Sequence, residues 1–194
     1  MKNQNKNYNS LQGKFLISSP NINDNVFRKS LIYIISDNED GSMGIIVNKP
    51  AHNINLTSLL GENIKDISKQ PQVCYGGPVE LDKGFILHTN DYVKDKNHIK
   101  LDNDLILSSN FSTIKEIALG SGPSKSILAL GYTGWASFQL QTELKKNDWF
   151  ELSLDTEIIF AKNHKKKWDQ AISKLGINKK LLQNAIFSNY SGSA

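Results

Sequence analysis

The amino-acid sequence predicts an α+β fold, in which one compact domain is built around a mixed or curled β-sheet flanked by three to four helices. Three observations predict this class. The 194 residues suit one domain with a single core. Seven or eight short apolar runs typical of strands are interleaved with three or four segments of helical periodicity. These strands follow one another too closely for a doubly wound parallel sheet, whose crossovers need about a dozen residues each.

The predicted strands are short and mostly apolar, and glycine, proline or polar residues end them. They cover residues 15–17, 31–35, 43–47, 73–75, 83–88, 101–109, 124–132 and 151–160, and the second and third form a hairpin. Helices are expected at 55–61, 111–119, 138–149 and 163–176. In the helix at 111–119 we expect Asn110 as cap and Gly120 as stop, and in the last helix Asn163 and Gly176.

The ends of the chain are polar, and the single domain is expected to span residues 11–187. Residues 1–10 lack the apolar core of a secretory signal, so we expect a disordered lead-in, and residues 188–194 form a frayed tail. No apolar run approaches the roughly 18 residues of a membrane span. Cys74 is the only cysteine, which suits a reducing cytoplasm. The net charge of +4 comes wholly from residues 145–194, with 9 Lys+Arg against 5 Asp+Glu.

The motifs that carry chemistry in well-known enzymes are missing from this sequence. Glycines precede Lys49 in DGSMGIIVNKP, but the spacing is not that of a P-loop and no helix follows, so a turn, a buried strand and a stop are expected. There is no GxSxG, GxGxxG or HExxH pattern. Cys74 and His88 could pair as nucleophile and base, although a small core cysteine is the more common role. We therefore predict no catalytic set, no metal site and no cofactor.

Five polar or aromatic side chains could still converge on one cleft, and three lysines could meet nucleic acid. The candidate cleft would contain Arg28, Asn48, His88, Trp135 and Gln139. Alternatively, Asn48 braces a neighbouring loop and the aromatics of GYTGW wedge a helix onto the sheet. Lys165, Lys166 and Lys167 could contact phosphates, while a solvated helix face is the simpler interpretation.

Ordered motifs from about Leu11 to Gly176 resemble the AlgH/YqgE family of small bacterial proteins. They are FLISSP, VFRKSLIYI, MGIIVNKP, YGGPV, GFILHT, LALGYTGW with QLQTEL and DW, and KKWDQAISKLGI. The resemblance implies a compact α+β domain around a bulky mixed sheet that tends toward a barrel. It implies no agreed catalytic residues, and some members carry a transcriptional-regulator label. Phe138 departs from the family pattern, which commonly has glycine or another small residue there, and it could fill a cleft beside Trp135; SSP replaces a more apolar tripeptide.

The sequence thus leads to a cytoplasmic, non-enzymatic binding or regulatory domain of unknown partner. One alternative is a small-ligand enzyme with a cryptic site near the Gly-Gly-Pro and Gly-Tyr-x-Gly-Trp loops. The other is a weak nucleic-acid binder that uses the C-terminal lysines.

Overall fold

The computed structural model describes residues 8–51, 54, 71–94, 98–101 and 104–177. The helix expected at 55–61, the first seven residues of the lead-in and the tail lie outside these residues. Within the described part, no helix has the length and apolarity that crossing a membrane requires. Tyr8 and Ser10, at the end of the lead-in, donate hydrogen bonds to the side chain and the carbonyl of Asp37, at 2.6 and 2.9 Å.

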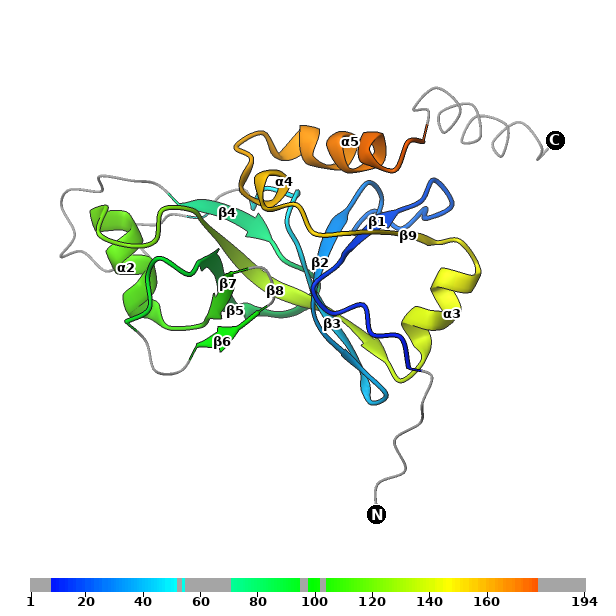
Figure 1. Ribbon diagram of the computed structural model, residues 1–194, viewed down its shortest axis with the longest axis horizontal. Coiled ribbons are helices and arrows are strands. Elements are labelled where there is room, and N and C mark those ends of the chain that lie inside the picture. Colours follow the sequence, from blue (N-terminus) through cyan, green and yellow to red (C-terminus); the bar gives the residue numbers. More distant parts are fainter. Residues whose placement is uncertain (1–7, 52–53, 55–70, 95–97, 102–103, 178–194) are drawn as a thin grey trace, which may run out of the picture.

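One curled, nine-stranded sheet forms the framework, in the order β6-β7-β5-β8-β3-β2-β1-β9, with β4 beside β8 (Figure 1). The β4–β8 pair is parallel and the other pairs are antiparallel, so the predicted mixed sheet is confirmed. The strands are β1 (Phe15–Ser18), β2 (Leu31–Asn38), β3 (Gly41–Ile46), β4 (Gln72–Tyr75), β5 (Val79–Thr89), β6 (Ile99–Lys100), β7 (Leu105–Ser108), β8 (Ser126–Ala136) and β9 (Trp149–Leu152).

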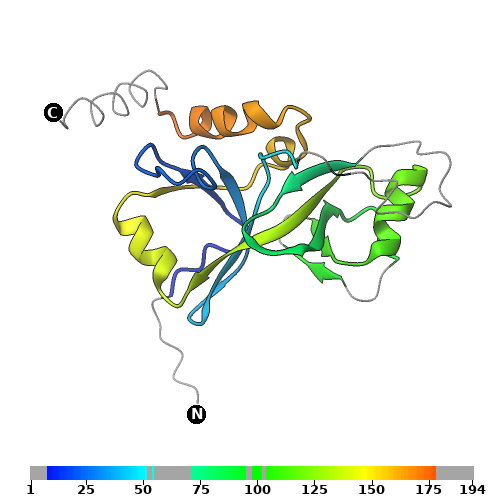
Figure 2. The ribbon, with the colours of Figure 1, turned by 180° about the vertical axis from the view of Figure 1, so that it is seen from behind.

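Both faces of the sheet are covered, which explains why strands such as β1 and β7 are buried along their whole length. On the inner face, Phe15, Tyr33 and Val47 pack with Trp168 and Ile172. Both partners belong to α5 (His164–Lys174), and α4 (Thr156–Phe160) adds Ile158 and Ile159 to the same cluster. On the outer face, α2 (Phe111–Leu119) covers β5 and β8, and α3 (Gln139–Lys145) covers the half formed by β1, β2 and β3. Figures 1 and 2 show α2 and α3 at opposite ends, with α4 and α5 along one side.

Glycines allow the Gly-Gly-Pro turn and strand β8 to contact each other through their backbones. Gly131 of β8 has a φ of 70°, and a Cβ there would lie 2.5 Å from the carbonyl oxygen of Gly77. A Cβ on Gly76 would lie 2.2 Å from the carbonyl oxygen of Gly131. The Gly-Gly-Pro turn therefore packs backbone against backbone on the Gly-Tyr-x-Gly-Trp segment.

Local signals identified α2 and α5 correctly and one segment wrongly. In α5, Asn163 accepts a hydrogen bond from Lys166 N at 3.2 Å, and Gly176, with a φ of 71°, follows the last turn. Asn110 accepts a hydrogen bond from Ser112 N at 2.9 Å, and Gly120 has a φ of 82°, as expected for the cap and stop of α2. The strand predicted over 151–160 is wrong beyond β9. The Asp155 carboxylate accepts from Glu157 N at 2.9 Å and starts helix α4, which buries its apolar residues on one side instead.

Candidate functional site

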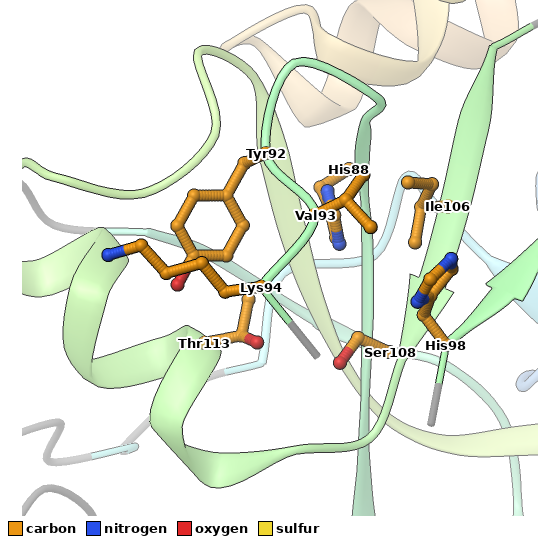
Figure 3. A pocket seen from close by; sticks show the side chains of 8 residues that line it. All are labelled: His88, Tyr92, Val93, Lys94, His98, Ile106, Ser108 and Thr113. Carbon is orange, nitrogen blue, oxygen red and sulfur yellow. The ribbon is translucent and has the colours of Figure 1, made fainter. Parts of the chain in front are cut away.

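A small pocket lies where β5, β7 and α2 meet, and we call it the His88 pocket (Figure 3). His88 is the last residue but one of β5, Ser108 is the last residue of β7, and Thr113 belongs to the first turn of α2. The pocket is lined by His88, Tyr92, Val93, Lys94, His98, Ile106, Ser108 and Thr113. It therefore gathers imidazole and hydroxyl groups from elements that the sheet places side by side.

His88 is buried and serves this pocket as a neutral imidazole. Its Nδ1 lies 2.8 Å from the carbonyl oxygen of Thr89, which can only accept, so Nδ1 carries the proton. Burial lowers the pKa of His88, and nearby His98 lowers it further, against the opposing effects of the Thr89 carbonyl and Asp91. In the neutral ring Nε2 is then an acceptor, suited to a hydroxyl or amide hydrogen.

The size of the His88 pocket limits what it can hold. Its volume is about 10 Å³, which is room for about one water molecule. Lys94 at the rim pairs with Glu116 at 3.4 Å and lies 5.5 Å from the centroid of the Tyr92 ring. Within the described residues no group of three His, Cys, Asp or Glu side chains could hold a metal ion. The pocket suits the tip of one uncharged polar group.

A second pocket is formed by the loop between β1 and β2 together with α5, and we call it the Trp168 pocket. It is lined by Ser19, Pro20, Ile22, Asn23, Arg28, Lys29 and Trp168, and its volume is about 20 Å³. The ammonium group of Lys29 lies over the Trp168 ring, 5.8 Å from its centroid. The Trp168 indole nitrogen donates to the carbonyl oxygen of Ser18 at 3.2 Å, which fixes the ring against β1.

Asn48 braces the loop that carries Arg28 and Lys29. Its amide oxygen accepts from Leu31 N and its amide nitrogen donates to the carbonyl oxygen of Lys29, both at 2.8 Å. Asn48 is only 8% exposed, so its side chain is used inside the protein. Lys49 donates to the carbonyl oxygens of Asn25 and Val26 and is likewise occupied. The structure thus favours the bracing role for Asn48 and places its amide outside the His88 pocket.

Trp135 and Gln139 meet at a third place, the carboxylate of Glu143 on α3. The indole nitrogens of Trp135 and Trp149 donate to Glu143 Oε2 at 2.9 and 2.7 Å, and Gln139 Nε2 donates to Oε1 at 2.9 Å. Gln139 Oε1 also accepts from Ala136 N at 3.0 Å. These bonds attach α3 to the sheet, as the packing interpretation of GYTGW expects.

The five candidate cleft residues therefore lie in separate surroundings. Arg28 lines the Trp168 pocket, His88 lines its own, Asn48 is buried behind the loop, and only Trp135 and Gln139 share a partner. Phe138 does not fill a cleft beside Trp135. It is 53% exposed and has a φ of 58°, the left-handed region in which glycine is favoured.

The first turn of α5 brings a lysine and a histidine to the buried thiol of Cys74. His164 Nδ1 lies 3.6 Å from Cys74 Sγ, so the histidine beside the thiol is His164 and not His88. Lys167 is fully buried and donates to the carbonyl oxygens of Val47 and Ile159 at 2.9 and 2.6 Å. Burial raises the pKa of Cys74 to about 12, so the group remains a thiol rather than a nucleophilic thiolate.

This burial corrects the expectation for the lysine run of α5. Lys165 and Lys166 are exposed on the first turn and can face solvent. Lys167 belongs to the core instead and cannot reach a phosphate outside. Burial is the main reason that the pKa of Lys167 is lowered to about 8.

Comparisons with known proteins show the family to which the chain belongs. Residues 15–180 match the family described as AlgH-like. The chain belongs to the AlgH-like family. It is similar to UPF0301 proteins of Afipia carboxidovorans, 36% identical over 90% of this chain and 88% of that protein, and of Rickettsia canadensis, 41% identical over 89% and 93%.

Solved structures show the same fold. The solution structure of the AlgH protein from Pseudomonas aeruginosa matches with a TM-score of 0.74 at 32% identity, covering 94% of this chain and 97% of that one. Protein DIP2367 from Corynebacterium diphtheriae has a TM-score of 0.71 at 20% identity, covering 86% and 88%, and shows the fold alone.

Sequence reasoning missed several groups that this AlgH-like chain places at its pockets. Ser108 and Thr113 complete the His88 pocket, and Ser19 and Trp168 complete the Trp168 pocket. Ser108 and Thr113 lie at the junction of a strand and a helix, where the pairing of β7 with β5 brings them to His88. Such a juxtaposition depends on strand order, which no local pattern contains.

Proposed function

We propose that this AlgH-like chain is a cytoplasmic, non-enzymatic binding or regulatory domain. The observation that carries the proposal is that the two side chains best suited to act as nucleophiles, Cys74 and Lys167, are buried. The Cys74 thiol is buried with a raised pKa, and the Lys167 ammonium is committed to two carbonyl oxygens. A nucleophile must be accessible and activated to act on a substrate, and neither group meets both conditions.

Recognition through the His88 pocket fits a binding role. The pocket offers a neutral imidazole acceptor beside the hydroxyl of Thr113, in a space for about one water molecule. Such a pocket receives one hydroxyl or amide group of a larger ligand or partner, whose remainder contacts the exposed side chain of Val93 at the rim. The cytoplasmic assignment rests on the lone free cysteine.

The alternative of a small-ligand enzyme placed its site near the Gly-Gly-Pro and Gly-Tyr-x-Gly-Trp loops. The structure brings these loops together, but their backbones are in such close contact that not even a Cβ fits at Gly76 or Gly131. Space for a substrate between the two loops is therefore lacking. A cavity of about 590 Å³ does lie beside them, and Tyr75, Leu81 and Leu130 belong to its lining. The enzyme alternative therefore depends on this cavity and not on the contact between the loops.

Turnover of a metabolite is the decisive test. The purified chain is incubated with the small-molecule fraction of a bacterial extract, and mass spectrometry follows both retention and consumption of each compound. We expect that a bound compound is retained without being consumed. The matched control is His88→Asn, which keeps a side-chain donor for the Thr89 carbonyl and removes the Nε2 acceptor. Catalytic consumption by the wild-type chain would refute the proposal.

Nucleic-acid binding remains a second candidate because Lys165 and Lys166 are both exposed on one turn of α5. Two lysines release few counterions, so we expect weak binding with a shallow salt dependence. Electrophoretic mobility shifts of duplex DNA at about 50 mM salt, with and without Lys165→Gln and Lys166→Gln, test it. Equal binding by the double variant, or none by the wild type, excludes these lysines as a nucleic-acid site.

A further inference from the structure

The Trp168 pocket presents two cations to one enclosed space. Arg28 and Lys29 are consecutive in the loop between β1 and β2, and both line the pocket. No ion pair in the described part of the chain includes either side chain. Lys29 contacts the face of the Trp168 ring, which is attractive but leaves its charge in place. The pocket is therefore positively charged.

The backbone of this loop is held in a strained conformation that positions Lys29. Lys29 has a φ of 52°, the left-handed region that non-glycine residues adopt only at an energetic cost. Asn48 holds the Lys29 carbonyl from one side, and the Ser18 hydroxyl accepts from Ser30 N at 2.8 Å on the other. Strain of this kind persists where surrounding bonds determine the conformation, and it is concentrated at ligand sites.

Neutral hydrogen-bonding groups accompany the two charges. Ser19 is buried, and its hydroxyl oxygen accepts from Asn21 N at 3.2 Å, which leaves the hydroxyl hydrogen available as a donor. Asn23 contributes a side-chain amide to the lining. Donors therefore predominate over acceptors, an arrangement complementary to an oxyanion.

The volume sets the size of the bound group. About 20 Å³ is space for one or two water-sized atoms. Two oxygen atoms of one carboxylate or phosphate fill such a space, and a guanidinium fork can bond both oxygens at once. A whole nucleotide does not fit, so the rest of a ligand extends from the pocket into solvent.

We propose that the Trp168 pocket binds a single oxyanion group, a carboxylate or phosphate, of a small molecule. Arg28 pairs with its oxygens, Lys29 supplies a second charge from the Trp168 side, and Ser19 donates a hydroxyl hydrogen. Trp168 forms the apolar wall, and Asn48 acts as a positioning residue through the Lys29 carbonyl. The site is separate from the His88 pocket, so it stands or fails independently of the function assigned to that pocket.

Acetate and inorganic phosphate are the probes for this site, because each supplies the proposed oxyanion without other groups. The full chain, labelled with ¹⁵N, is titrated with either salt while chloride keeps the ionic strength constant. We expect saturable shifts of the Trp168 indole signal and of the Ser19 and Lys29 amides. Shifts that follow ionic strength alone, or that are spread over the whole surface, would overturn the assignment.

Variants separate the two cations from general charge. Arg28→Gln and Lys29→Gln should each weaken binding at least tenfold, whereas Lys29→Arg should retain it. The control is Lys115→Gln on α2, which removes one exposed charge away from the pocket and should leave binding unchanged. The ¹⁵N spectrum of each variant shows directly that it is folded. Equal binding by wild type and Arg28→Gln contradicts the proposal.

A single-stranded oligonucleotide distinguishes a small-molecule site from a nucleic-acid site. If the Trp168 pocket takes small molecules, the oligonucleotide should leave the Trp168 indole signal unchanged at concentrations that saturate with phosphate. Displacement of phosphate by the oligonucleotide, with shifts at Lys165 and Lys166, would overturn the small-molecule assignment.

Discussion

Replacing Lys167 with methionine tests whether a charged lysine is held inside the protein. Burial lowers the Lys167 pKa from 10.5 to about 8, outweighing the opposing effect of the nearby Cys74 thiol. In the unfolded chain the pKa returns to its usual value, so the unfolded state binds more protons between about pH 8 and pH 10.5. The free energy of unfolding therefore rises with pH across that window. Below it both states are protonated, and the folded protein bears the whole penalty of about 3 kcal/mol.

Methionine does not titrate. The difference in free energy of unfolding between wild type and Lys167→Met therefore isolates the contribution of Lys167. From about pH 7 to about pH 9.5 the wild type should gain about 2 kcal/mol relative to Lys167→Met. Urea unfolding of both proteins at several pH values measures the difference, and the titration of other groups cancels. In the folded state the pKa of His164 is lowered from 6.5 and that of Cys74 is raised to about 12, so both lie outside the window. Cys74 of the unfolded chain titrates within it, but it does so in both proteins and cancels in the difference.

Two results decide this prediction. Parallel stability curves for wild type and Lys167→Met would refute the reasoning, because they would mean that burial does not change the protonation of Lys167. The control is Lys166→Met, which removes an exposed lysine from the same helix turn and should give curves parallel to the wild type.

Two further substitutions test features of the α3 region. Phe138→Gly should raise the free energy of unfolding by about 0.5–1 kcal/mol, since an exposed side chain at a φ of 58° is replaced by the residue that prefers this conformation; an equal or lower value in urea unfolding contradicts this. Glu143→Ala should lower the free energy of unfolding by about 2–4 kcal/mol, because the indole nitrogens of Trp135 and Trp149 lose their acceptor. Near-ultraviolet circular dichroism would report the loosened indoles, and the exposed Glu151→Ala is the control, expected to change stability by less than about 1 kcal/mol.

Much of the fold was predictable where short-range rules decide the structure. Asn110 and Gly120 set the bounds of α2 through hydrogen bonds and a backbone conformation that involve only neighbouring residues. The hairpin of β2 and β3 follows from the same local logic. The strand expected through Thr156 failed because alternating apolar residues outweighed the capping signal of Asp155. A five-residue helix offers too little periodicity to distinguish it from a strand.

The candidate site was less predictable, because its contacts join distant parts of the chain. The Cys74–His164 pair spans 90 residues and depends on how α5 docks against β4. The burial of Lys167 is different, because the sequence contains a signal that could have predicted it. Lys167 lies one residue before Trp168 and four before Ala171, on the apolar side of α5. The surrounding lysines made the whole run look solvated, which concealed the position of one member.

Strand β8 has a consequence for how the protein is made. Its first half lies between β4 and β5 and its second half pairs with β3, so both ends of the sheet depend on it. During synthesis its partners β3, β4 and β5 are complete before residues 126–136 leave the ribosome. Their apolar faces must wait without this shared neighbour, and β1 also waits for β9. We therefore expect a nascent chain cut before Ser126 to be bound by chaperones, and folding to follow the release of nearly the full-length polypeptide.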